Sequence, residues 1–502
     1  MSPSCDRSCY RNHVPKGTFL LSYKGDILME FRHPHIVAFP SRAGSVTLSA
    51  LMKSLPTDIS IREVETSFEH HAYRTPIKFG GVAVSHCTLL NVRIRVRTRT
   101  GREAEGSGSM PLGSVWSYPS KTIPEADRLE AMKALAEKIG GLLRDSDLCA
   151  HPVELSHELE PAALKLGAKV TRARKLAEPV PKLCTVVVFS PFDAALHDAY
   201  GKVHGRHVYD CYGAEWMNAD IARYLDPSFA GEYLDRYSLR RPKARMPLYH
   251  LIGALDALTD ADVKERLHDG LPNTLGEWIV KDQLTHLKIK LNGDNAEWDV
   301  NRVLAVERVV AETQARRGVE RWVYSLDFNE QCKNVDYLLE VLKRVKEGSP
   351  VAFGRVAYVE QPTARDLKAH PENKMHAAAA LKPVVIDESL TDYETFLLAR
   401  EQGYSGVALK ACKGQSQALL MAAAAQKRDM FLCVQDLTCP GQSFLHSAGL
   451  AAHIGPVTAI EGNSRQYCPA ANVEWAKKFP GVFTVREGTI ETGCLEQVGL
   501  GH

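Results

Sequence analysis

The stretch HLKIK, residues 286–290, decides the fold that this sequence predicts, because an apolar, strand-like run ends there in charged side chains. Four segments of the same design follow: VYSLD ending at Asp327, VAYVE ending at Glu360, PVVIDE with Asp387 and Glu388, and GVALK ending at Lys410. The charged ends from Lys290 onward are separated by 37, 33, 27 and 23 residues. Each interval has the length of one strand, one loop and one helix, so the pattern predicts a repeating β/α unit.

This repeat predicts an α/β fold, a closed parallel barrel of the (β/α)8 type. Strands and helices alternate from Met246 to Pro480, a span of 235 residues, close to the roughly 250 expected for eight units. The strands are predicted at 247–252, 286–290, 322–327, 356–360, 383–387, 406–410, 431–435 and 457–461. All strands of such a barrel end at one face, so the charged side chains should meet in a single pocket.

The residues before the barrel predict an α+β domain over 59–245. Period-two alternation of apolar and polar residues in 60–73 and 89–101 predicts half-buried antiparallel strands. Segment 104–118, AEGSGSMPLGSVWSY, is predicted to be a Gly/Ser-rich loop, and helices are predicted in 123–143 and 190–205. Residues 1–58 form an extension for which the sequence indicates no role. Residues 481–502 are expected to form a tail that packs on the α+β domain.

Composition favours an ordinary globular protein of the cytoplasm. The net charge of +2 gives no electrostatic reason to expect binding to nucleic acid or to an anionic membrane. The amino-terminal residues lack the apolar core of a secretion signal, and the apolar run 418–425 is too short to span a bilayer. The 12 cysteines are scattered through a long chain, which favours reduced thiols in the cytosol.

Three acids at consecutive strand ends predict a metal site. Asp327, Glu360 and Asp387 offer carboxylate oxygens without nearby Cys or His pairs, a donor set that favours a hard cation, with Mg²⁺ as the first choice. Each acid alone could equally cap the helix after its strand or pair with a lysine. Three acids in consecutive units favour a shared metal site over three separate helix caps or ion pairs.

The lysines predict bases beside the metal. Lys288 and Lys290 are two residues apart on one strand, so they point to the same side, where each ammonium should lower the pKa of the other. Lys410 ends the sixth strand, on the opposite side of the barrel. We interpret Lys382 and Lys413, which lie outside the strand ends, as surface lysines.

A metal between amine bases suits removal of the proton α to a carboxylate, because the cation stabilises the enediolate that forms. Enolase-superfamily sites pair Lys or His bases with Mg²⁺ for this purpose.

At these residues the sequence resembles the enolase superfamily, and within it the muconate lactonizing enzyme-like branch of the mandelate racemase/muconate lactonizing enzyme family. The motifs that carry the resemblance are KIKLNGD (288–294), SLDFN (325–329), VEQP (359–362), IDES (386–389) and ALKACKG (408–414). In addition, PFDAALHDAYGK (191–202) looks like the helix before the barrel, and YRTPIKFGG (73–81) looks like the substrate-covering loop of the capping domain.

The resemblance implies a modified barrel with a capping domain, which often associates into homo-oligomers. It implies that Asp327, Glu360 and Asp387 bind Mg²⁺ and that Lys290 and Lys410 form the acid/base pair. Lys288 would tune Lys290 and help to hold the substrate carboxylate. The residues expected to support the site or contact the substrate are Glu388, Asn329, Asp436 and Glu461.

The sequence also departs from this pattern. Dipeptide epimerases of the family usually carry an acid-x-acid pair after the eighth strand, where this chain has Glu461-Gly462-Asn463. Asp436, after the seventh strand, could face the substrate or equally cap the next helix. No His-Asp dyad like that of the mandelate racemase branch is present.

We therefore expect a Mg²⁺-dependent enzyme that acts on a small-molecule carboxylate, as a racemase, an epimerase or a cycloisomerase. The first alternative is an acid-sugar dehydratase or another lyase of the same superfamily. The second is a barrel that kept the fold but serves as a non-catalytic scaffold.

Overall fold

The computed structural model describes residues 53–79 and 81–502, and within these residues eight parallel strands close into a barrel. Neighbouring strands pair in the order of the chain, and β12 pairs with β5 to complete the ring. The strands are β5 (Arg245–Ile252), β6 (His286–Lys290), β7 (Val323–Asp327), β8 (Val356–Glu360), β9 (Val384–Ile386), β10 (Gly406–Leu409), β11 (Phe431–Val434) and β12 (Ile460–Glu461). Each coincides with a predicted strand, and the predicted barrel is confirmed.

Helices connect the barrel strands, as the spacing of the charged ends requires. They are α5 (Leu275–Asp282), α6 (Ala296–Arg317), α7 (Val335–Gly348), α8 (Pro350–Arg355), α9 (His376–Ala379), α10 (Tyr393–Glu401), α11 (Gln415–Lys427), α12 (Gln442–His453), α13 (Ser464–Tyr467), α14 (Val473–Lys478) and α15 (Pro480–Phe483). The apolar run 418–425 lies in α11, where it is largely buried against the barrel. None of the helices in the described ranges is long and apolar enough to cross a membrane.

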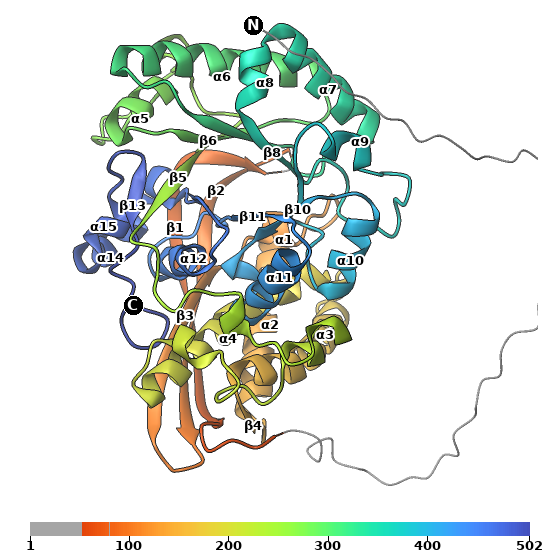
Figure 1. The fold of residues 1–502 in the computed structure, drawn as a ribbon, viewed down its shortest axis with the longest axis vertical. Coiled ribbons are helices and arrows are strands. Elements are labelled where there is room, and N and C mark those ends of the chain that lie inside the picture. The colour runs from red at the N-terminus through yellow and green to blue at the C-terminus, as the bar shows by residue number, and fades with distance from the viewer. Residues whose placement is uncertain (1–52, 80) are drawn as a thin grey trace, which may run out of the picture. The chain divides into compact units, whose positions relative to one another are not determined.

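An antiparallel sheet with its own helices precedes the barrel, which confirms the predicted α+β capping domain as part of the fold. The sheet has the order β3-β2-β1-β4. Its strands are β1 (Ile59–Phe79), β2 (Val82–Thr98), β3 (Glu103–Pro111) and β4 (Cys149–Ala150), and its helices are α1 (Ser114–Ser117), α2 (Glu125–Arg144), α3 (Pro152–Ala173) and α4 (Lys182–His204). Helices α2 and α4 pack against the sheet (Figure 1). Helix α3 was not anticipated from the sequence.

The alternation along β2 explains why the sheet has one buried and one exposed face. Val92, Ile94 and Val96 are buried in the core. The intervening Arg93 and Arg95 point to the other face, where they pair with glutamates on the neighbouring strands. An apolar residue at every second position is what a strand needs to cover a core on one side.

The predicted loop 104–118 is wrong over its first half, because residues 103–111 form β3. Its glycines serve close packing against α4. A Cβ atom added at Gly106 would lie 2.2 Å from the backbone nitrogen of Ala199, and one added at Gly108 would lie 2.1 Å from the carbonyl oxygen of Pro191. The missing side chains therefore let the strand and the helix backbone touch, a use of glycine that composition alone does not distinguish from a flexible loop.

Gly106→Ala is expected to destabilise the protein by about 1–3 kcal/mol or more, since neither backbone can move aside cheaply. Gly141→Ala is the matched control, because nothing lies within 4 Å of a Cβ atom at that position in α2. The control is expected to gain about 0.5–1 kcal/mol from helix propensity. Urea unfolding of both variants would measure the difference, and equal stability would show that β3 and α4 are not in tight contact.

Two features attach the capping domain and the end of the chain to the barrel. At the tip of the β1–β2 hairpin, Lys78 Nζ donates to Asn292 Oδ1, 3.1 Å away, just after β6. Strand β13 (Thr489–Glu491) pairs antiparallel with β5, and the backbone nitrogen of Leu500 donates to Asp198 Oδ1 in α4 at 3.0 Å. The division at 59, 246 and 481 stays a prediction, and most of the amino-terminal extension (1–52) lies outside the described residues.

Candidate active site

The predicted site residues lie at the carboxyl ends of consecutive barrel strands, and all of them are buried. They lie in or directly after five strands: Lys288 and Lys290 in β6, Asp327 at the end of β7, Glu360 at the end of β8, Asp387 and Glu388 after β9, and Lys410 after β10. The polar loop after β8 helps to set this arrangement, because Gln361 Oε1 accepts a hydrogen bond from the backbone nitrogen of Asp387 at 2.9 Å. The structure therefore brings these residues together at one mouth of the barrel.

Lys288 lies at the centre of the cluster. Its Nζ is 2.9 Å from Asp327 Oδ2, 2.8 Å from Glu360 Oε2 and 2.7 Å from Glu461 Oε2. One ammonium group thus contacts carboxylates from three different strands.

Lys290 lies beside it on the same strand. Its Nζ donates to Asp327 Oδ2, and to Asn329 Oδ1 at 2.8 Å. Asn329 takes a backbone φ of 43° and donates its own backbone nitrogen to Asp327 Oδ1 at 2.8 Å. Asn329 therefore orients both the lysine and the acid.

Asp387 lies between two further lysines. Lys410 Nζ is 2.9 Å from Asp387 Oδ2, and Lys413 Nζ is 3.1 Å from Asp387 Oδ1. Lys413 also donates to the carbonyl oxygen of Asp387. The interpretation of Lys413 as a surface lysine is wrong: it is buried, because a short 3-10 helix (Ala411–Lys413) turns it back toward the barrel mouth.

The charges of this cluster set the pKa values of its lysines. Burial alone would lower the pKa of Lys288, but the negative charges of Asp327, Glu360 and Glu461 raise it well above its ordinary value. For Lys288, the expected lowering by a neighbouring ammonium is therefore wrong. Burial likewise opposes the charge of Lys410, and Asp387 outweighs it and raises the pKa of Lys410.

Glu388 has a different environment from the other acids. Burial, followed by the charge of Asp387, raises the pKa of Glu388 to about 7. Its Oε1 accepts from Trp116 Nε1 at 2.8 Å and from Asn329 Nδ2 at 3.4 Å, whereas its Oε2 is buried without a hydrogen-bond partner.

Trp116, in helix α1 of the capping domain, is a residue that the sequence analysis missed. Its ring lies 4.7 Å from Lys410 Nζ, and its carbonyl oxygen accepts from Arg365 Nη1 at 3.0 Å. Arg365 is itself held by Glu330. A tryptophan within a segment predicted to be a Gly/Ser-rich loop was the signal that could have indicated a buried role.

Strand ends β11 and β12 supply Asp436 and Glu461. Glu461 Oε1 accepts from Asn463 Nδ2 at 2.7 Å, while its Oε2 contacts Lys288. The carboxylate of Asp436 accepts from the backbone nitrogens of Thr438, Cys439 and Asn463. Burial, and then the charge of Glu461, raises the pKa of Asp436 to about 7. Asp436 therefore holds the turn after β11 and does not cap the next helix, because α12 begins only at Gln442 with Gly441 as its N-cap.

The donor set suits a hard cation. Asp327, Glu360 and Asp387 are carboxylates on three successive strands, and two further buried oxygens in the mouth, Gln435 Oε1 and Asn463 Oδ1, have no hydrogen-bond donor. Oxygen donors of this kind fit a small divalent cation. Across residues 53–79 and 81–502, no three His, Cys, Asp or Glu side chains are arranged to hold a metal ion as they stand. Asp327 Oδ2 and Glu360 Oε2 instead contact the ammonium group of Lys288.

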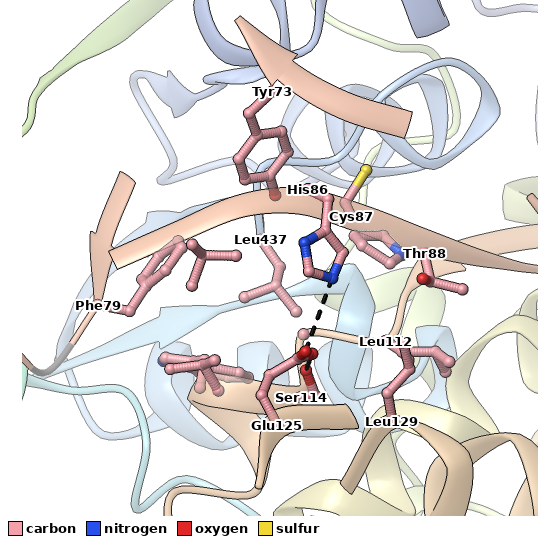
Figure 2. A pocket seen from close by; sticks show the side chains of 15 residues that line it. Tyr73, Phe79, His86, Cys87, Thr88, Leu112, Ser114, Glu125, Leu129 and Leu437 are labelled. Carbon is pink, nitrogen blue, oxygen red and sulfur yellow. Dashed lines mark hydrogen bonds and ion pairs between the residues drawn. The ribbon is translucent and has the colours of Figure 1, made fainter. Parts of the chain in front are cut away.

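Capping-domain side chains cover this mouth. Phe79, at the end of β1, has its ring 5.7 Å from Lys290 Nζ. Beside it lies a small cavity of about 40 Å³, around which Tyr73, Phe79 and Leu437 gather (Figure 2). A polar contact between His86 and Glu125, 3.7 Å apart, closes another side. This cavity has room for little more than a water molecule or two, so it reflects how closely the capping domain approaches the barrel.

Comparison with known proteins finds a family model for part of the chain and many structures with the same fold. A family model described as Enolase C-terminal domain-like matches residues 272–502. No curated protein sequence is similar enough to this chain to count as a relative.

Many solved structures share the fold. One is a dipeptide epimerase from Enterococcus faecalis V583 complexed with Mg and the dipeptide L-Leu-L-Tyr, with a TM-score of 0.56 and 15% identity over 88% of this chain and 99% of that one. A muconate lactonizing enzyme from Pseudomonas fluorescens complexed with muconolactone has a TM-score of 0.55 and 18% identity over 88% and 96%. A substrate-liganded L-Ala-D/L-Glu epimerase from Bacillus subtilis has a TM-score of 0.57 and 17% identity over 88% and 98%.

Such identities establish a common fold, and the family match covers most of the barrel, including all the lysines and acids of the cluster. Residues 272–502 therefore match the Enolase C-terminal domain-like family, and the chain shares the fold of the epimerases and the muconate lactonizing enzyme named above.

Proposed function

We propose that this protein removes the proton α to the carboxylate of a small acid, forms an enediolate, and returns a proton to complete an isomerisation. The observation that carries the proposal is the position of two lysines. Lys290 and Lys410 come from β6 and β10, which are separated by three strands in either direction around the closed ring. Two amines on opposite sides of a barrel mouth can reach opposite faces of a substrate carbon held between them.

The proton is transferred between the α-carbon of the substrate and these two amines. One lysine, in its neutral form, accepts the α-proton, and the electron pair of the broken C–H bond moves into the carboxylate to give the enediolate. The other lysine, as an ammonium, donates a proton to the opposite face of the carbon. A racemase or an epimerase needs both steps, whereas a cycloisomerase or a dehydratase needs one lysine as catalyst.

Asp327, Glu360 and Asp387 would hold Mg²⁺, the hard cation that their oxygens favour. Bound there, Mg²⁺ would stabilise the negative charge that develops on the substrate carboxylate. Two observations support this part of the proposal: the buried oxygens without donors, and the similar dipeptide epimerase structure that is complexed with Mg.

The remaining residues of the cluster position these groups. Lys288 would help to hold the substrate carboxylate, and Asn329 would orient Lys290. Glu388 would support the side of the mouth that carries Lys410, and Glu461 would hold Lys288. We expect Asp436 to act through the turn that it holds and not by contact with the substrate.

The subclass is proposed from the paired amines, which favour a racemase or an epimerase, with a cycloisomerase next. Structures with this fold include dipeptide epimerases and muconate lactonizing enzymes. We further propose that the protein works in the cytoplasm as a homo-oligomer, with a small carboxylic acid as its partner.

The test is a screen of carboxylic acids with Mg²⁺ in D₂O, in which NMR follows exchange of the α-proton and mass spectrometry follows loss of water. Exchange that starts from either enantiomer supports a two-base isomerase. Loss of water with exchange of one enantiomer alone supports the dehydratase alternative. Binding of Mg²⁺ and acids without exchange or dehydration would contradict catalysis and favour a scaffold.

Trp116→Phe is expected to lower kcat by about 10- to 100-fold with little change in KM. The variant keeps the ring over Lys410 but loses the N–H bond to Glu388, and a hydrogen bond to a charged group contributes roughly 1.5–3 kcal/mol. Steady-state kinetics on a substrate from the screen would measure this split. Trp475→Phe, in α14 outside the site, is the control. If KM rises while kcat is preserved, Trp116 is only a wall of the pocket and does not position Glu388.

A further inference from the structure

A second and much larger cavity, of about 420 Å³, lies between the capping domain and the barrel mouth. Asn329 and Glu388 form part of its barrel wall, and Lys121 and Arg128 form part of its capping-domain wall. Its volume falls in the range of small-molecule sites, roughly 300–1,000 Å³. Since Asn329 accepts from Lys290, the cavity begins at the proposed reacting centre.

The barrel end of this cavity offers an acceptor. Glu388 is 1% exposed, and its Oε2 has no hydrogen-bond partner although Oε1 has two. A buried oxygen left without a donor is costly, so its natural partner is a hydroxyl or amide N–H of a bound molecule.

The capping end offers positive charge. Arg128 is 4% exposed, its Nη1 donates only to the carbonyl oxygens of Tyr118 and Ser114, and its Nε is buried without a partner. Lys121 is exposed, and no carboxylate in the described ranges pairs with it. Buried guanidinium groups ordinarily contact a carboxylate, so one that contacts only carbonyl oxygens on a cavity wall is the feature to explain.

The other charged groups on the cavity do not cancel this excess. Arg365 is neutralised by Glu330, which it contacts through several hydrogen bonds. Glu178 is the remaining acid, and its Oε1 accepts from Thr122 Oγ1. The charges of Glu125 and Glu178 act on Arg128 from a distance, but no carboxylate in the described ranges lies within ion-pair distance of Lys121 or Arg128.

We propose that this cavity binds the distal part of the substrate, which carries a second anionic group that reaches Lys121 and Arg128. A hydrogen-bond donor next to the reacting carbon meets Glu388. The substrate class is then a dianionic small acid, such as a hydroxy- or amido-dicarboxylate, and a monocarboxylate would leave the cations unpaired. This inference rests on the proposed function, because it takes the reacting carboxylate to lie at Lys290 and Lys410.

The test compares acids that differ only in the second carboxylate: 2-hydroxyglutarate against 2-hydroxypentanoate, and 2-hydroxyadipate against 2-hydroxyhexanoate. Calorimetry with the full-length protein and Mg²⁺ is expected to show that each dicarboxylate binds at least tenfold more tightly than its partner. The inference is overturned if the two acids of each pair bind with equal affinity. It is also overturned if none of the four acids binds.

Lys121→Glu is expected to abolish the preference, because it reverses a charge on the wall. This exposed lysine has no structural contact to lose, whereas Arg128 holds two carbonyl oxygens and its replacement risks misfolding. Lys138→Glu makes the same charge change on an exposed site of α2 away from the cavity and should keep the preference. A preference that survives Lys121→Glu unchanged places the anion elsewhere and overturns the assignment.

The same samples separate this inference from the proposed function. In D₂O, a dicarboxylate preference without exchange of any α-proton would contradict the proposed function and leave the cavity assignment intact. Exchange of monocarboxylates as readily as dicarboxylates would leave the proposed function intact and contradict the cavity assignment.

Discussion

Lys290→Ala and Lys410→Ala are each expected to lower turnover by about 10²- to 10⁴-fold, the usual contribution of a positioned acid or base. For a two-base isomerase the losses should differ by enantiomer. Each variant keeps one amine, so it should still exchange the α-proton of one enantiomer in D₂O while failing on the other. The two variants should be complementary in this respect.

NMR of α-proton exchange from each pure enantiomer measures this result. Lys382→Ala is the matched control, because Lys382 lies partly exposed on the outside of the barrel and donates only to the carbonyl oxygen of Gly354. Near-normal exchange of both enantiomers by either site variant would remove that lysine from the chemistry. Loss of both enantiomers in one variant alone would instead favour the single-base alternatives.

Lys288→Met is expected to destabilise the metal-free protein by about 3–5 kcal/mol, because removal of one partner leaves buried charge uncompensated. Here the groups left behind are Asp327, Glu360 and Glu461, all within 2.9 Å of the ammonium that is lost. If Asp327 and Glu360 hold Mg²⁺, saturating Mg²⁺ should restore much of the lost stability, since a cation then neutralises these acids again.

Urea unfolding in EDTA and in Mg²⁺ measures both parts of this prediction. Lys382→Met changes the same side chain outside the cluster and should be nearly neutral in both conditions. If the free energy of unfolding of Lys288→Met is the same in EDTA and in Mg²⁺, the proposed ligand role of Asp327 and Glu360 is contradicted. A variant as stable as the parent in EDTA would contradict the central place of Lys288.

The barrel and its charged mouth could be predicted because they follow from local patterns. Each strand is a short apolar run, and the charged residue that ends it lies at a fixed place in the repeat. Asp327, Glu360 and Asp387 can therefore be identified without knowledge of their contacts. Closure of the ring, by pairing of β12 with β5, then brings them together.

The direction of the lysine pKa shift could not be predicted from the same pattern. The spacing of Lys288 and Lys290 shows that two ammonium groups are neighbours, which lowers a pKa. It does not show that three acids from other strands surround Lys288, and these contacts reverse the sign. The interpretation of Lys413 fails for a related reason, because a single turn of 3-10 helix redirects it toward Asp387.

Trp116 and β3 illustrate the limits of composition. A run of Gly and Ser usually indicates a loop, but here the small residues let a strand contact a helix backbone, and the chain that follows carries the tryptophan to the barrel. Both outcomes depend on a partner surface far away in sequence. No local signal specifies that partner.

Trp116 links two residues of the site, because it contacts both Lys410 and Glu388. Its ring shields Lys410 from solvent, and its N–H anchors Glu388. Any displacement of α1 would break both contacts at once. The cover over Lys410 and the orientation of the Glu388 carboxyl group are thus coupled through one side chain, so neither can change without the other.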